Sequence, residues 1–358
     1  MKKLMTLLFL FPFLLISQKA TIYSSSGSNF DPPREQLWRG IIFAPEEKES
    51  SSADFLLNFK KLVEDALVPK GINLVIFDMH WNNFHFVCRP ELERLSLPVG
   101  RYFTKADARK MSKICKDNGI RVMVGMNFLT HQNFGQLLRA FPEYQWPGEK
   151  KLWDPFNKKV NPVAFAMADE LIDAFQPEGF HIGMDEAWDF DVSTHPEANG
   201  YNNAELWAKC VNEYYQHIVK KRELEMLIWS DMFDERHGKG TSDALKQIPD
   251  DIIMCYWEYG NHKEYPWIKK FLDEGFRVLA CPWNNEDATI SLVNSAIKNK
   301  ENPKMLGILY TTWSNAVSSD LRPALLQEGD QSKLDKTIQG IAKGMESTIP
   351  LLLEKDIK

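Results

Sequence analysis

Two adjacent carboxylic acids, Asp185 and Glu186, directly follow a short apolar run at 179–184. Like charges at neighbouring positions repel, and apolar surroundings disfavour both anions, so one member of such a pair is pushed towards its protonated form. A protonated acid beside a carboxylate suits the cleavage of a glycosidic bond, because one group protonates the leaving oxygen while the other stabilises positive charge at the sugar carbon. A simpler interpretation is that Asp185 caps a helix and Glu186 is a solvated residue in its first turn. The neighbouring His181 and Trp188 favour the catalytic interpretation.

Tryptophan is frequent, and many of its positions coincide with the ends of short apolar runs. The chain has 11 Trp among 358 residues, and aromatic residues make up 12%. Sugar rings present flat C–H faces that pack on aromatic rings, so tryptophans gathered around a pocket favour a carbohydrate ligand. The alternative is that some of them only fill the top of the fold, since Trp is a large apolar side chain. The six at run ends are Trp81, Trp188, Trp229, Trp257, Trp283 and Trp313.

The elements that must position these residues alternate regularly along the chain. Short runs rich in Val and Ile predict buried strands, and between them apolar residues recur three or four apart, which predicts amphipathic helices. Eight such units predict an α/β fold, a (β/α)8 barrel, whose active sites lie at the C-terminal ends of the strands. A doubly wound open sheet is the alternative, but no Gly-x-Gly-x-x-Gly follows any predicted strand. The predicted strands are 40–44, 72–79, 120–127, 179–184, 226–231, 252–257, 277–281 and 306–313, and the predicted helices are 53–67, 104–118, 161–175, 202–221, 241–248, 265–274, 287–299 and 331–352.

The segment His181-x-Gly183-x-Asp185-Glu186 resembles the signature of glycoside hydrolase family 20, the β-N-acetylhexosaminidases. The resemblance implies a retaining hydrolysis in which the 2-acetamido oxygen of the substrate attacks the anomeric carbon, an exception to the usual two-carboxylate scheme. Asp185 would orient and polarise that acetamido group, and Glu186 would act first as general acid and then as general base. The resemblance also implies a carbohydrate substrate containing N-acetylhexosamine, and no cofactor.

Further segments match the family in chain order. Arg39, preceding Gly40, is similar to the family's arginine that grips sugar hydroxyls, and its planar fork of donors suits that role. His131, preceded by Leu129 and Thr130, resembles the histidine of the family's Pro-Gly-His segment. The resemblance makes His131 and His181 residues that orient the acid pair, while satisfied structural histidines are the alternative for both. Three tryptophans match those that wall the family's acetamido pocket: Trp229, Trp257 and Trp313.

The sequence also departs from the family pattern. Asn315 stands where the family usually has a glutamate that binds distal hydroxyls, and 281–285 lacks the family's tyrosine that holds the acetamido group. Only a short leader precedes the first predicted strand, without the family's small α/β domain, which predicts a divergent, barrel-only member. A carbohydrate-binding barrel that has lost turnover therefore stays open, although retention of both acids argues against it.

Metal-dependent hydrolysis is a further alternative, because several histidines lie near predicted strand ends. His80, His131 and His181 could join Asp185 and Glu186 around an ion, but no His-x-His or His-Glu-x-x-His pair at ligand spacing is present. We therefore expect no metal. The five cysteines include no Cys-x-x-Cys pair, and we expect buried thiols.

The beginning of the chain and its charge bear on where the protein works. Residues 1–20 combine a basic start, a 13-residue apolar run and a polar end, which is typical of a secretory signal peptide and too short for a comfortable membrane span. We expect a flexible leader at 21–37, the barrel at 38–358, and an exported protein, periplasmic or extracellular, without stable membrane insertion after cleavage. A net charge of −6 gives no electrostatic reason to expect a nucleic-acid partner.

Overall fold

The computed structural model describes residues 36–45, 52–80, 83–87, 103–132, 138, 141–237, 240–314 and 316–356. The predicted signal peptide and residues 21–35 of the predicted leader lie outside these residues, as do Trp81, Cys88 and Asn315. None of the helices within the described ranges is long and apolar enough to cross a membrane.

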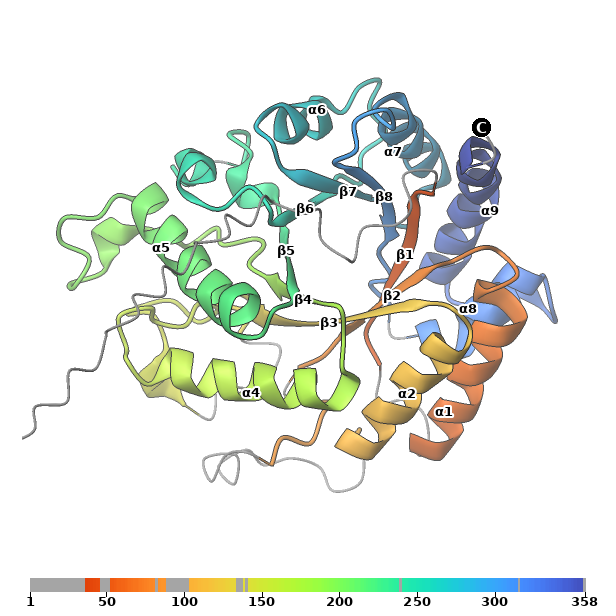
Figure 1. Ribbon diagram of the computed structural model, residues 1–358, viewed down its shortest axis with the longest axis horizontal. Coiled ribbons are helices and arrows are strands. Elements are labelled where there is room, and N and C mark those ends of the chain that lie inside the picture. Colours follow the sequence, from red (N-terminus) through yellow and green to blue (C-terminus); the bar gives the residue numbers. More distant parts are fainter. Residues whose placement is uncertain are drawn as a thin grey trace, which may run out of the picture. The chain divides into compact units, whose positions relative to one another are not determined.

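Eight parallel strands pair in chain order and close into a barrel, with β1 hydrogen-bonded to both β2 and β8. This closure confirms the predicted (β/α)8 barrel and excludes the doubly wound sheet, which is open. Figure 1 shows the helices arranged around these strands. The strands are β1 (Trp38–Phe43), β2 (Leu74–Asp78), β3 (Arg121–Phe128), β4 (Gly179–Gly183), β5 (Glu225–Trp229), β6 (Ile253–Trp257), β7 (Arg277–Cys281) and β8 (Met305–Tyr310).

The strands are apolar at nearly every position because both of their faces are covered. In β2, Leu74 and Ile76 belong to the cluster that fills the barrel interior, while Val75 and Phe77 belong to the larger cluster between barrel and helices. Successive side chains of a strand point to opposite faces, and in this fold both faces are buried. The short apolar runs in the sequence therefore show no alternation with polar residues.

The α-helices cover the outside of the barrel. The predicted helices at 53–67 and 202–221 each consist of an α-helix that continues as a π-helical turn, and the predicted helix at 241–248 is a 3-10 helix over Ser242–Gln247. No helix was predicted at α8, which contains Pro323, a residue that usually interrupts helices. The helices are α1 (Ser52–Lys61), α2 (Lys105–Asp117), α4 (Val160–Phe175), α5 (Asn203–Tyr215), α6 (Pro266–Asp273), α7 (Glu286–Lys298), α8 (Val317–Leu326) and α9 (Lys336–Asp356).

Reciprocal caps fix where two of these helices begin. The Asn202 side chain accepts a hydrogen bond from the Glu205 N–H at 2.9 Å, and the Glu205 carboxylate accepts one from the Asn202 N–H at 2.9 Å. Thr104 and Asp107 form the same arrangement at the start of α2. Each pair satisfies amide groups that the first helical turn leaves without partners.

The closure between β1 and β8 depends on a glycine. Gly307 pairs with Trp38 and has a φ of 140°. A Cβ at Gly307 would lie 2.1 Å from the backbone oxygen of Trp38. No other residue fits there without moving one of the two strands.

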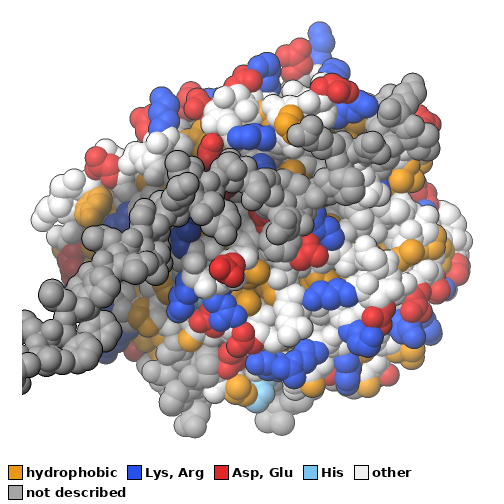
Figure 2. All heavy atoms as spheres, viewed as in Figure 1, with side chains coloured by type: hydrophobic (Ala, Val, Ile, Leu, Met, Phe, Trp, Pro, Cys, Tyr) orange, Lys and Arg blue, Asp and Glu red, His pale blue; other side chains and the backbone are white. Residues whose placement is uncertain are grey.

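Basic and acidic side chains are interspersed on the face of the molecule that Figure 2 shows. Ion pairs at the surface include Arg322 with Asp65 at 2.8 Å and Arg222 with Asp173 at 2.7 Å. Pairs of this kind at a surface are worth about 0–1 kcal/mol each. The apolar clusters, not these pairs, therefore hold the barrel together.

Candidate active site

Asp185 and Glu186 stand on a tight turn that directly follows β4. Three residues of this turn have left-handed backbone: Gly183 (φ 69°), Met184 (φ 69°) and Glu186 (φ 52°). Such angles are uncommon for residues that carry side chains, and they cluster at functional sites. No helix begins at the pair. The interpretation of Asp185 as a helix cap is therefore wrong.

Side chains from neighbouring positions hold the backbone of this turn. The Asn127 Oδ1, on β3, accepts a hydrogen bond from the Met184 N–H at 2.9 Å. A Cβ on Gly183 would lie 1.6 Å from that same oxygen, so only glycine leaves room for it. The Gly183 N–H donates to His181 Nδ1 at 3.0 Å, and the buried His181 ring lies 4.3 Å from the Trp229 ring, centroid to centroid. The His181 ring thus supports the turn by accepting a hydrogen bond from the turn's backbone.

His131, which follows β3, bridges the two acids. Its Nε2 lies 3.4 Å from Asp185 Oδ2 and 3.6 Å from Glu186 Oε2. Burial would lower the pKa of His131, but the hydrogen bond to Asp185 and the charges of Asp185, Glu186 and Asp231 outweigh burial and raise that pKa above its ordinary value. The two acids thus favour the cationic form of the imidazole, and that form in turn attracts both carboxyl groups.

Two more carboxyl groups face the pair, and neither was predicted as a site residue from the sequence. Burial, with the nearby Asp185, raises the pKa of Asp78 to about 6, against the opposing charges of His181 and His131. Asp231 follows β5, and its Oδ2 accepts a hydrogen bond from the Glu186 N–H at 2.8 Å. Both residues lie within predicted strand runs, at or near the C-terminal end, which is the signal that could have found them.

The two acids differ in their access to solvent. The side chain of Asp185 is 17% exposed and that of Glu186 is 42% exposed. Asp185 is therefore suited to hold an enclosed part of a ligand. Glu186 can exchange a proton with a leaving group or with water.

Aromatic side chains form a wall at the same end of the barrel. The Trp229 and Trp313 rings are 5.8 Å apart, and the Tyr259 ring is 5.2 Å from both Trp257 and Trp283, centroid to centroid. The Trp313 Nε1 donates a hydrogen bond to the Tyr259 hydroxyl at 2.8 Å. The structure thus brings together the three predicted tryptophans and adds a tyrosine, whose hydroxyl gives the wall a polar point.

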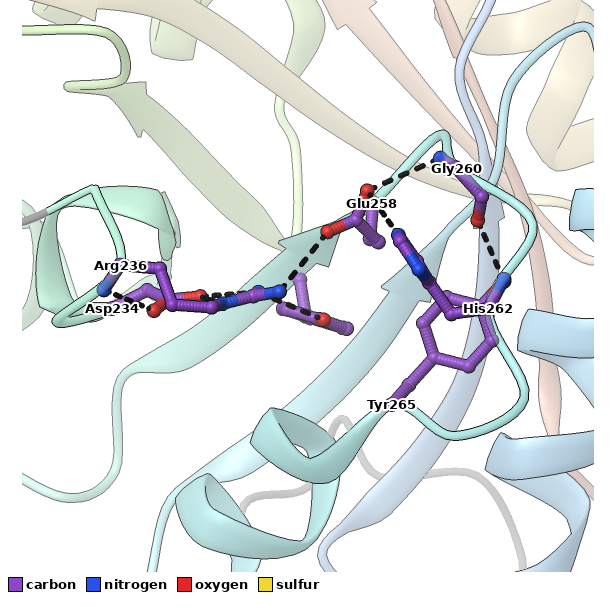
Figure 3. A network of polar contacts seen from close by, with 7 residues as sticks. Asp234, Arg236, Glu258, Gly260, His262 and Tyr265 are labelled. Atoms are coloured by element: carbon purple, nitrogen blue, oxygen red, sulfur yellow. Dashed lines mark hydrogen bonds and ion pairs between the residues drawn. The ribbon is translucent and has the colours of Figure 1, made fainter.

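A network of polar contacts, drawn in Figure 3, fixes the loops that carry part of this wall. Arg236, after β5, donates from Nε to Asp234 Oδ2 at 2.8 Å and from Nη1 to Glu258 Oε2 at 3.5 Å. Glu258, after β6, accepts a hydrogen bond from the Gly260 N–H at 3.1 Å. Because Tyr259 lies between Glu258 and Gly260, the network holds the turn that presents this tyrosine.

Arg39 does not lie with these residues. It is the second residue of β1, at the N-terminal end of the barrel, and it is 2% exposed. Its Nε donates to the Gly71 carbonyl at 2.6 Å, in the segment that leads into β2, and its Nη1 donates to the Leu37 carbonyl at 3.2 Å. The prediction that Arg39 binds sugar hydroxyls is therefore wrong, because a residue that begins a strand lies at the opposite end of the barrel from Asp185.

The described residues also bear on metal and thiol chemistry. Within them, no group of three or more His, Cys, Asp or Glu side chains is arranged to hold a metal ion, so the metal-dependent alternative has no ligand set there. Four cysteines are buried and free: Cys115, Cys210, Cys255 and Cys281.

A closed barrel with two acids and an aromatic wall at the C-terminal ends of its strands has the arrangement of a (β/α)8 enzyme. Residues 84–341 match the family described as glycosyl hydrolase family 20, catalytic domain. The match covers more than half of the chain, and the chain belongs to this family. A search of curated protein sequences found no match.

Solved structures with the same fold include three bacterial proteins, each matched over most of the present chain. The chitobiase of Flavobacterium johnsoniae has a TM-score of 0.62 at 18% identity, over 89% of this chain and 52% of its own. The exo-β-N-acetylglucosaminidase of Vibrio harveyi, solved with N-acetylglucosamine, has a TM-score of 0.60 at 14% identity, over 90% of this chain and 58% of its own. The β-N-acetylhexosaminidase of Bacteroides fragilis has a TM-score of 0.58 at 13% identity, over 87% of this chain and 66% of its own. The present chain thus spans little more than half the length of the first two, and the likeness is one of fold.

Proposed function

We propose that this protein is a glycoside hydrolase that removes terminal N-acetylhexosamine residues by a retaining, substrate-assisted mechanism. The observation that carries the proposal is the left-handed turn that presents Asp185 and Glu186 together to His131, beside an aromatic wall. Membership of glycosyl hydrolase family 20 supports the reaction class. The similar structures named as an N-acetylglucosaminidase and an N-acetylhexosaminidase support N-acetylhexosamine as the sugar.

In the first step, the carbonyl oxygen of the substrate's 2-acetamido group attacks the anomeric carbon and the bond to the leaving oxygen breaks. Glu186 gives its proton to that oxygen, which is the role its exposure allows. Asp185 accepts a hydrogen bond from the acetamido N–H and stabilises the positive charge that spreads over the new ring. A cyclic oxazolinium ion results.

In the second step, water attacks the anomeric carbon from the side that the leaving group vacated. Glu186, now a carboxylate, takes a proton from this water, and the oxazolinium ring opens to restore the acetamido group. Two successive inversions at the anomeric carbon give net retention. His131 keeps both acids in place through its contacts to Asp185 and Glu186.

The tryptophan wall supplies the surface on which the sugar and its acetamido methyl group pack. Trp229, Trp257 and Trp313 are the residues we assign to this role, and the Tyr259 hydroxyl is the polar group among them. Aromatic rings of this kind bury large apolar area with little loss of conformational freedom.

A carbohydrate-binding barrel without turnover is the second candidate function. The end of β7 favours it, because the Asn285 side chain there accepts a hydrogen bond from the Ala288 N–H at 3.0 Å and so caps α7 rather than turning to a ligand. Binding alone, however, requires no strained turn that positions a second acid.

Turnover of a 4-nitrophenyl N-acetyl-β-glucosaminide, compared with the matching glucoside, tests the proposal. We expect hydrolysis of the first and almost none of the second, because the glucoside lacks the attacking group. Retained binding of N-acetylglucosamine without hydrolysis would support the second candidate.

The substrate-assisted step has its own test. A thiazoline analogue of the cyclic intermediate should inhibit the wild-type protein strongly and the Asp185→Asn variant much less, since tight binding of such mimics reflects complementarity to the charged state. A 2-fluoro sugar should leave both acids unlabelled. Covalent labelling of Asp185 or Glu186 would show direct attack by a carboxylate instead.

A further inference from the structure

The backbone of Glu186 is held in an unfavourable conformation by a residue that follows another strand. A φ of 52° costs a non-glycine residue about 1–2 kcal/mol relative to right-handed backbone. The Glu186 N–H donates to Asp231 Oδ2 at 2.8 Å, and Asp231 comes from the segment after β5. Asp231 therefore ties the acid of the β4 turn to the next strand of the barrel.

Asp231 is buried between acidic, aromatic and imidazole groups of neighbouring strands. It is 4% exposed. Asp185 and Glu186 face it from the turn after β4, His131 faces it from the loop after β3, and the Trp257 indole lies beside it from β6. In the described part of the chain, no lysine or arginine pairs with it, and His131 is already shared between Asp185 and Glu186.

Two oxygens in this cluster are buried without a hydrogen bond. They are Oδ1 of Asp231 and Oδ1 of Asp185, and neither has a partner among the described residues. Burial, together with the negative charge of Asp185, raises the pKa of Asp231 to about 8, although backbone N–H groups and the Trp257 indole oppose the shift. A proton on the Oδ1 of Asp231 would leave its Oδ2 free to accept from Glu186.

We propose that Asp231 is a positioning residue that works as a neutral carboxylic acid, accepting the Glu186 N–H through Oδ2 while keeping a second negative charge away from Asp185. The proposal rests on the proposed function of the acid pair. If Asp231 lost its proton, two buried carboxylates would repel each other. That repulsion would disturb the geometry in which Asp185 holds the positive ring of the intermediate.

Three variants separate the two parts of this proposal. Asp231→Asn keeps an oxygen acceptor and has no charge, so it imitates the protonated acid. Asp231→Ala removes the acceptor. Ser230→Ala is the matched control, because the neighbouring Ser230 Oγ is buried and has no hydrogen-bond partner among the described residues.

At pH 6, we expect the Asn variant and the control to keep kcat within about threefold of wild type. The Ala variant should lose on the order of 10²-fold in kcat with little change in KM, the cost of a misplaced catalytic group. The ratio of Asn-variant to wild-type kcat/KM should rise between pH 7 and 9, as the wild-type residue ionises. An Asn variant as impaired as the Ala variant at pH 6, an Ala variant with wild-type kcat, or a constant ratio would each overturn the proposal.

Urea unfolding tests the same two claims without a substrate. The wild-type midpoint should fall relative to that of the Asn variant as the pH rises from 6 to 8, because over this range the native state keeps a proton that the unfolded chain has already lost. The Ala variant should have a lower midpoint than the Asn variant at pH 6, since the Glu186 N–H loses its acceptor. A pH-independent difference, or equal midpoints for the two variants, would refute the inference. If the wild-type protein hydrolyses no N-acetylglucosaminide but unfolds as expected, only the proposed function fails.

Discussion

Glu186 combines strained backbone with an accessible side chain, which is the combination that a proton donor at the mouth of a barrel needs. The hydrogen bond from its N–H to Asp231 fixes the backbone, and the contact with His131 fixes the carboxyl group. The side chain nevertheless remains 42% exposed. Its position is thus determined without closing its path to water.

Glu186→Gln should separate protonation from binding. The amide keeps the shape of the acid but has no proton to give, so hydrolysis of substrates with poor leaving groups should fall by ~10²–10⁴-fold. Substrates with good leaving groups, such as 4-nitrophenol, need less protonation and should lose less. Equal losses on both kinds of substrate would contradict the assignment of Glu186 as the acid.

Asp78→Asn should alter how stability depends on pH. Burial raises the native pKa of Asp78 to about 6, above the ordinary value of 3.8, so between these pH values the native state keeps a proton that the unfolded chain loses. The free energy of unfolding therefore falls as pH rises through this window, by about 3 kcal/mol, and this contribution is constant above pH 6. The variant cannot titrate at this position, and its difference from wild type, measured by urea unfolding, should change from pH 4 to 6 and then level off.

The exposed Asp243 provides the control for that measurement. Asp243→Asn also removes one carboxyl group, and its difference from wild type should not follow the window of pH 4 to 6. A constant difference between wild type and Asp78→Asn across the range would show that Asp78 is not held protonated.

At the scale of the elements, periodicity predicted the barrel because each strand is covered on both faces and each helix on one. The same logic brought Asp185, Glu186, His131 and the tryptophans to one end, since strand ends share a face. The prediction for Arg39 failed because it considered only which strand carries the residue. The position of a residue within its strand decides which end of the barrel its side chain reaches, and Arg39 lies near the beginning of β1. Asp231 and Tyr259 were missed for another reason: the end of a strand run marks Asp231 only as a candidate, and the role of each residue depends on contacts between strands.

Adding a single methyl group at Gly183, in the turn after β4, should greatly reduce the stability of the protein. Gly183→Ala would place a Cβ 1.6 Å from Asn127 Oδ1 and force an alanine into left-handed backbone. We expect a loss of about 2–5 kcal/mol in the free energy of unfolding, from overpacking and backbone strain together. The activity of the folded fraction should fall as well, because the turn carries both acids.

Gly119→Ala is the matched control for this change. Gly119 has a φ of 72°, close to the 69° of Gly183, and nothing lies within 4 Å of a Cβ placed there. The control therefore measures backbone strain alone, by urea unfolding. Equal losses in the two variants would show that Asn127 yields easily and does not hold the turn.

At the scale of the whole molecule, we propose that the protein is exported, on the basis of the segment at 1–20. The mature protein should begin near Ala20, be found outside the cytoplasm and be extractable without detergent. Mass spectrometry of the mature N-terminus in cell fractions checks this. An intact segment 1–20 in the membrane fraction would favour an anchor instead.

The pairing of β1 with β8 sets an order on folding. β1 is the first described strand and β8 is the last, so the pairing of Trp38 with Gly307 joins residues that leave the ribosome far apart in time. Contacts of such long sequence separation form slowly, because the chain between them must first be ordered. Until β8 emerges, β1 has an open edge that can pair with another chain. The nascent chain is therefore most exposed to misassembly just before β8 emerges, and a chaperone that covers this edge would have its greatest effect in that interval.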